Sequence, residues 1–216
     1  MIVAPIRPRP VGMGSESSVR EDHLMPATRV TLTGDAAADK LLSTKPLAVL
    51  IGMVLDQQVP MEWAFRGPEE LRRRLPGPFT AAHIAAVDPD ELVTIFSTKP
   101  ALHRYPGSMA GRTQALCHAI VDEYGGTPAA IWTKAVDGQD LYRRIKGLPG
   151  FGEMKAKIFI ALLGKQYGLS TPGWQEICAP YGEPGSFRSV ADVVDLESLE
   201  RVRTTKAQMK KAAKER

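Results

Sequence analysis

Residues 148–165 read LPGFGEMKAKIFIALLGK and join a glycine-rich turn directly to a segment with helical apolar periodicity. We expect Gly150 and Gly152 to adopt positive φ angles and to let the backbone approach a ligand closely. The first amides of the following helix have no intrahelical partner and lie at the positive end of its dipole. The stretch therefore predicts a phosphate-binding turn.

A short helix is predicted immediately before this turn, over DGQDLYRRIKG (137–147), with Asp140 as its cap and Gly147 at its end. Helix, turn and helix together form the outline of a helical hairpin, an outline that also occurs in ordinary helix connections. Lys155 and Lys157 fall in the first turn of the second helix, where positive charge opposes the dipole. A polyanion bound nearby would explain these two lysines.

The hairpin resembles the helix-hairpin-helix of the HhH-GPD superfamily of base-excision DNA glycosylases, with apolar-Pro-Gly-apolar-Gly followed by lysine, alanine and an aliphatic run. The resemblance implies a two-lobed, mostly helical fold that acts in DNA repair on double-stranded DNA containing a damaged or modified base. The hairpin would hold a DNA phosphate, with a monovalent cation as an assisting ligand. The residues matched to this role are Leu148, Gly150, Gly152, Lys155 and Lys157.

A second point of resemblance lies in IGMVLDQQVPMEWAF (51–65). Superfamily members carry a buried helix that ends in a Gln-containing stretch, and the glutamine enters the duplex where a base has been flipped out. Gln57 and Gln58 match this base-flipping wedge, since a planar amide can fill the hole and pair with the orphaned base. The alternative is a helix end before a proline stop at Pro60, where polar residues need no function. The resemblance covers roughly residues 40–165.

Met154 occupies the position that distinguishes bifunctional from monofunctional glycosylases of the superfamily. In bifunctional members of the superfamily this position, two after the second hairpin glycine, is a lysine that forms a Schiff base with the sugar. Lys155 is one helical step away, a rotation of about 100°, and would not point into the same pocket. The resemblance therefore implies a monofunctional glycosylase that hydrolyses the N-glycosidic bond and has no lyase activity.

The catalytic aspartate of the superfamily would fall on Pro172, so the alignment assigns no carboxylate. Glu176, Asp192 and Asp56 remain as candidates, and each could equally be a surface or capping acid. If none of them serves, the chain would be a non-catalytic helix-hairpin-helix DNA-binding protein. An interaction domain without DNA is a third alternative, against which the LPGFG turn argues.

Three residues are candidates for the pocket that receives the extruded base: Met154, Trp63 and Trp174. Flat indoles can sandwich a base, which is the reason for choosing the tryptophans. Either tryptophan could equally belong to the core.

Composition restricts the partners. The chain has 216 residues, of which 44% are hydrophobic, and no apolar run approaches the roughly 20 residues of a membrane span. We expect no membrane partner and a cytoplasmic monomer. The only cysteines, Cys117 and Cys178, are too few for an iron–sulfur cluster held by four thiolates, and we expect them to be small buried residues. We expect no metal-based chemistry and, apart from the cation at the hairpin, no cofactor.

The positive charge is concentrated at the C-terminal end. Residues 200–216 hold seven basic and two acidic residues, a net charge of +5, whereas the rest of the chain carries −1. This tail could lie along DNA phosphates or be a solvated helix. Residues 1–26 are rich in Pro, Gly and Ser and predict a disordered leader.

The pattern between leader and tail is predominantly helical and predicts a mostly α protein with one helical domain over 27–199, in which the hairpin occupies about 138–165. Only TRVTLTG (28–34) alternates like a strand, which allows at most a small N-terminal strand or hairpin. Besides the hairpin, periodicity and caps predict helices over 45–58, 69–75 (opened by Gly67-Pro68), 80–87 (capped by Thr80), 89–98 and 109–126 (ending at Gly125).

Overall fold

The computed structural model describes residues 31–214, with side chains as far as residue 212. Within 31–214 the chain forms α-helices, one 3-10 helix and no strand, which confirms the mostly α class. Residues 31–34 of the predicted strand form none, and residues 28–30 and the leader 1–26 lie outside the described part. The helices are, in chain order, α1 (Ala36–Thr44), α2 (Pro46–Leu55), α3 (Met61–Arg74), α4 (Ala81–Ala86), α5 (Pro89–Ser97), α6 (Pro106–Tyr124), α7 (Ala130–Thr133), α8 (Gly138–Gly147), α9 (Glu153–Gln166), α10 (Trp174–Ile177), η1 (Val190–Asp192) and α11 (Leu196–Lys214).

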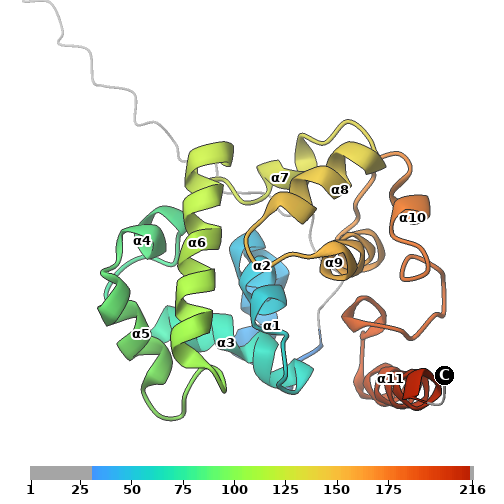
Figure 1. Cartoon of the computed structure of the whole chain (residues 1–216), viewed down its shortest axis with the longest axis horizontal. Helices are drawn as coiled ribbons and strands as arrows, with labels where there is room; N and C mark the ends of the chain where they lie inside the picture. Colours follow the sequence, from blue (N-terminus) through green and yellow to red (C-terminus); the bar gives the residue numbers. More distant parts are fainter. Residues whose placement is uncertain (1–30, 215–216) are drawn as a thin grey trace, which may run out of the picture.

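Helix α2 forms the centre of the core, because every one of its residues is buried. It lies between α6 on one side and α9 on the other (Figure 1). Pro46 begins the helix at a position where its missing N–H costs nothing. The helix ends at Leu55, three residues before the predicted end at residue 58, and Gln58 takes a left-handed φ of 57°. Both glutamines of the predicted wedge therefore lie in the α2–α3 loop.

Helix α3 shows that the predicted helix start at Gly67-Pro68 was wrong. The helix begins at Met61 and continues through Pro68 to Arg74. A Cβ at Gly67 would lie 2.4 Å from Cδ1 of Leu55, so the glycine is needed for the close approach of α3 to α2. The helix continues through Pro68 although an interior proline removes one helical hydrogen bond.

The caps explain most of the other helix ends. The Thr80 side chain accepts a hydrogen bond from the His83 amide, and Gly125 ends α6 in the left-handed region at φ 61°, both as predicted. Helix α8 is capped by Asp137 and not by the predicted Asp140. Asp140 lies in the first turn and pairs with Arg143 and Arg144.

The C-terminal segment wraps from α9 through α10 and η1 to α11. Helix α11 contains most of the basic tail; Leu199 and Val202 anchor it to the core, and its later residues are exposed. Cys117 and Cys178 are both buried, as expected. None of the helices between residues 31 and 214 combines the length and apolar character that a membrane span needs.

Candidate functional site

The turn of the hairpin has the geometry of a type II β-turn. The Phe151 amide donates to the Leu148 carbonyl at 3.0 Å, Pro149 occupies the second position, and Gly150 has a φ of 86° at the third. This confirms the positive φ at Gly150. The same expectation for Gly152 was wrong, because its φ of −92° and ψ of −179° are extended backbone open to any residue. Leu148 and Phe151 are buried and anchor the turn.

Gly152 is the N-cap residue of α9. No side chain caps the amides of this first turn, and nothing lies within 4 Å of the position that a Cβ on Gly152 would take. Gly152, Glu153 and Met154 are exposed. The helix therefore presents uncapped amides at the positive end of its dipole to solvent, which is the arrangement that anions bind.

Both lysines of this turn have protein partners, so a polyanion is not needed to explain them. Lys155 Nζ donates to the carbonyl oxygens of Met53 at 2.5 Å and Val54 at 3.2 Å, in the last turn of α2. Lys157 forms an ion pair of 3.2 Å with Glu153. The Lys155 bonds satisfy carbonyls that the end of α2 leaves without a helical donor. Burial of Lys155 lowers its pKa to about 8.

The C-cap of α2 is Asp56, and its carboxylate is close enough to Lys155 for the charge of that lysine to act on it. Burial raises the pKa of Asp56, while the positive charges of Lys206 and Lys155 lower it to a smaller extent. No ion pair or hydrogen bond to this carboxylate is found in the described part of the chain. Groups whose pKa is shifted by burial and by nearby charges cluster at functional sites, which makes Asp56 a candidate for a functional group.

The two glutamines that follow differ in freedom. Gln57 is fixed by both ends of its amide: Nε2 donates to the Val54 carbonyl at 2.7 Å, and Oε1 accepts from Arg112 Nη1 at 2.7 Å. Gln58 is exposed and has a single side-chain contact of 3.3 Å, from the Tyr105 hydroxyl. The Gln58 side chain is therefore exposed to solvent, whereas the Gln57 side chain is fixed between Val54 and Arg112.

The α5–α6 loop contributes residues that the sequence did not single out. His103 is buried; its Nδ1 accepts from the Tyr105 amide at 3.0 Å, so Nε2 carries the proton and donates to the Gln57 carbonyl at 2.9 Å. Burial lowers the pKa of His103 and favours this neutral form. Tyr105 stays 42% exposed beside Gln58. In the sequence these residues stand in an irregular loop with no motif to identify them.

The other candidate residues lie at the opposite end of α9. Asp192 pairs with Lys165 at 2.6 Å and closes a capping box with Ser189. The Trp174 ring covers Gly164, where a Cβ would meet it at 2.3 Å. Gly152 and Lys165 are separated by about 20 Å along the helix axis. Trp174 and Asp192 are therefore not brought to the hairpin.

Glu176 is also distant from the turn. It is exposed on α10, which contacts the start of α8, where a Cβ on Gly138 would meet the Gly173 carbonyl at 2.4 Å. The turn follows the far end of α8. Of the three candidate carboxylates, Asp56 alone lies beside the hairpin. Met154 is 64% exposed on the first turn of α9.

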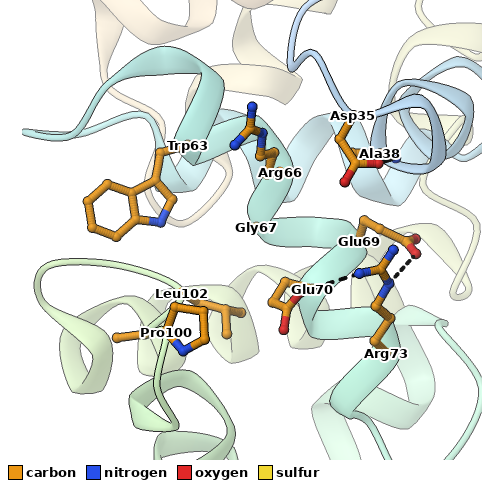
Figure 2. Close-up of a pocket in the computed structure, with 11 residues that line it drawn as sticks. Asp35, Ala38, Trp63, Arg66, Gly67, Glu69, Glu70, Arg73, Pro100 and Leu102 are labelled. Atoms are coloured by element: carbon orange, nitrogen blue, oxygen red, sulfur yellow. Dashed lines mark hydrogen bonds and ion pairs between the residues drawn. The ribbon is translucent and has the colours of Figure 1, made fainter.

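Trp63 lines a separate open pocket of about 310 Å³ between α3 and the α5–α6 loop (Figure 2). Its indole faces Pro100 and Leu102, and charged side chains of α3 form the opposite wall. Glu69 in that wall is already paired with Arg73, so the charges largely compensate one another. Trp63 lies in the first turn of α3, directly after the α2–α3 loop that contains Gln57 and Gln58, which we call the glutamine loop.

The carbonyl oxygens of the hairpin are the groups that would hold the expected monovalent cation. The Leu148 carbonyl accepts the turn hydrogen bond and the Gly152 carbonyl accepts the Ala156 amide. Each carbonyl oxygen keeps a second lone pair that an ion could use. The cation therefore stays a prediction.

A scan against protein-family models found no match to this chain, and a search of curated proteins found no significant one.

Proposed function

We propose that this chain is a monofunctional DNA glycosylase that hydrolyses the N-glycosidic bond of a damaged or modified base in duplex DNA. The observation that carries the proposal is the unpaired carboxylate of Asp56, half-buried beside the uncapped N-terminus of α9. The amides at the start of α9 would bind an anion, and the Asp56 carboxylate would stabilise a cation. A phosphodiester that is attached to a sugar undergoing cleavage presents both charges.

In this proposal the amides at Gly152 and after it hold a backbone phosphate and fix the position of the strand. Gln58 enters the duplex in place of the extruded nucleotide, supported by Gln57 and flanked by the Tyr105 ring. The helices on the two sides of α2 correspond to the two lobes that the superfamily resemblance implies, and the DNA lies across their junction as the ligand of a monomer.

Asp56 supplies the negative charge that the reaction needs. The bond between sugar and base breaks with its electron pair leaving on the base, and positive charge develops on the sugar. The carboxylate stabilises this charge and accepts a proton from the water that adds to the sugar carbon, and the departing base takes up a proton from solvent water. A raised pKa suits a general base near neutral pH.

The second candidate is a non-catalytic helix-hairpin-helix DNA-binding protein. Two observations favour it: the position of the superfamily aspartate holds Pro172, and Lys155 is engaged with the carbonyls of α2. This candidate predicts the same phosphate contact at the hairpin but no base release.

A single-turnover excision assay over duplexes that each contain one lesion separates the two candidates. Abasic sites are revealed as strand breaks after alkali. On a substrate that is excised, Asp56→Asn should lower the rate by about 10²- to 10³-fold, because it removes a charge that acts in the transition state. The control Glu176→Gln, on exposed α10, should leave the rate and the DNA affinity unchanged.

Equal excision by Asp56→Asn and wild type would contradict the role of Asp56. Duplex binding without base release across the panel would support the non-catalytic protein. An absence of duplex binding would reject both candidates.

A further inference from the structure

Helix α11 carries a basic stripe that continues the face by which it is anchored. At 100° per residue, Arg203, Lys206, Lys210 and Lys211 fall within an arc of about 140°. Leu199, buried against the core, falls in the same arc. The face of α11 that is apolar at Leu199 is therefore positively charged further along the helix, from Arg203 onward.

Two contacts place the beginning of this stripe beside the candidate site. Arg203 pairs with Glu62 in the first turn of α3, directly after the glutamine loop. Lys206 is close enough to Asp56 for its charge to act on that carboxylate. The stripe thus starts at the loop between α2 and α3.

Within the described residues, no ion pair accounts for the lysines of the stripe. Residues 201–214 contain six basic residues and no acidic one. Arg201 and Arg203 form ion pairs, whereas no ion pair of Lys206, Lys210 or Lys211 is found in the described part of the chain. All three lysines are exposed. Lys206 and Lys210 repel each other across one helical turn, so their spacing costs stability in the free protein.

We propose that α11 is a second nucleic-acid-binding element, whose lysines lie along the phosphates of the duplex held at the hairpin. The inference rests on the proposed binding of duplex DNA and adds a contact that the hairpin does not supply. From Arg203 to Lys211 the helix is about 12 Å long, and one strand of B-DNA has a phosphate every 3.4 Å or so of its axis. The three lysines, Lys206, Lys210 and Lys211, span about 7.5 Å of this length, which matches about three phosphates.

The test compares two triple variants with the same change of charge. The stripe variant is Lys206→Ala, Lys210→Ala and Lys211→Ala; the control is Lys40→Ala, Lys45→Ala and Lys134→Ala, at exposed positions on other elements. Each protein is titrated with an undamaged duplex over a range of salt concentrations. The stripe variant should flatten the log–log salt dependence by about 0.9 per lost contact, so by about 2 to 3, and the control should keep the wild-type slope.

Equal slopes for the two triple variants, with wild-type binding intact, would overturn the inference and leave the hairpin proposal untouched. An absence of duplex binding by wild type would overturn both. Binding to vesicles of phosphatidylserine and phosphatidylcholine that is lost in the stripe variant, without duplex binding, would identify an anionic membrane surface as the partner instead. Because excision is measured separately, a failure of the glycosylase proposal with a changed slope would still support the role of α11.

Discussion

The ammonium group of Lys155, in the first turn of α9, donates a hydrogen bond of 3.2 Å to the carbonyl oxygen of Val54 in the last turn of α2. A positive charge at the C-terminal end of a helix interacts favourably with its dipole. The contact connects the hairpin with the loop that contains Asp56, Gln57 and Gln58. We expect the relative position of amides, carboxylate and glutamines to depend on it.

Replacement of Lys155 should change the pH dependence of stability. Burial lowers the pKa of Lys155 from 10.5 to about 8, so the unfolded chain binds more protons between these values. Stability therefore gains a contribution as pH rises from about 8 to 10.5, and Lys155→Met should lack it. Urea denaturation across this interval measures the difference. The control Lys157→Met removes only the ion pair with Glu153 and should keep the wild-type dependence.

The ionised side chain of Asp56 should destabilise the folded protein at neutral pH. Its pKa is raised by burial, so the folded state binds the proton more tightly than the unfolded state does. The stability that protonation provides is present at acid pH and is lost as pH rises through the folded pKa. Asp56→Asn should thus be more stable than wild type at neutral pH, and the difference should disappear below the ordinary aspartate pKa. A destabilised Asp56→Asn at neutral pH would indicate a structural role.

Asp192 provides the contrast to Asp56. Its side chain is 5% exposed and pairs with Lys165. Asp192→Asn should destabilise the protein by about 3 to 5 kcal/mol, because it removes the counter-charge of the largely buried Lys165, which would keep its hydrogen bond to the Glu183 carbonyl. Chemical denaturation of both variants under the same conditions compares the two carboxylates.

The two hairpin glycines should respond differently to alanine. Gly150→Ala requires a left-handed φ of 86° and places a Cβ 3.2 Å from Val54, so we expect a loss of about 1 to 3 kcal/mol. The backbone at Gly152 is extended and the space beside it is open, so the stability of Gly152→Ala should stay within about 0.5 kcal/mol of wild type. If a phosphate binds the α9 amides, Gly152→Ala should nevertheless weaken duplex binding. Unchanged binding would place the phosphate elsewhere.

The paired glutamines make a similar test of the wedge. Gln57→Ala removes the bonds to Val54 and Arg112 and should cost about 1 kcal/mol of stability. Gln58→Ala should leave stability nearly unchanged but reduce base extrusion, followed by the fluorescence of an adenine analogue in the duplex. If Gln57→Ala reduced base extrusion and Gln58→Ala did not, Gln57 would be the residue that enters the duplex.

Local signals were sufficient for much of this fold. Periodicity predicted α4, α5, α6, α8 and α9, and the predicted end signals were right for α4 and α6 but assigned the cap of α8 to the wrong aspartate. The groups that decide these helices are neighbours in sequence. The start of α3 was missed because Gly67 serves a tertiary contact with Leu55 within the helix, and local sequence alone reads Gly-Pro as a helix start. The nearness of Asp56 to Lys155 depends on two helix ends that meet only in the folded chain, so the sequence could not choose among three carboxylates. His103 and Tyr105 gave no signal, since their positions depend on tertiary hydrogen bonds to the glutamine loop.

Any base excision should leave the DNA strand intact. A lyase needs an amine that attacks the sugar, and the superfamily position for that amine holds Met154, whose thioether cannot form a Schiff base. The neighbouring amine of Lys155 is half-buried and already donates to two carbonyls of α2. On a lesion that is excised, the product should be an abasic strand that breaks only after alkali. Borohydride treatment should trap no covalent complex. A complex that forms with wild type and is lost in Lys155→Met would show that Lys155 leaves the α2 carbonyls during the reaction and acts as the nucleophile.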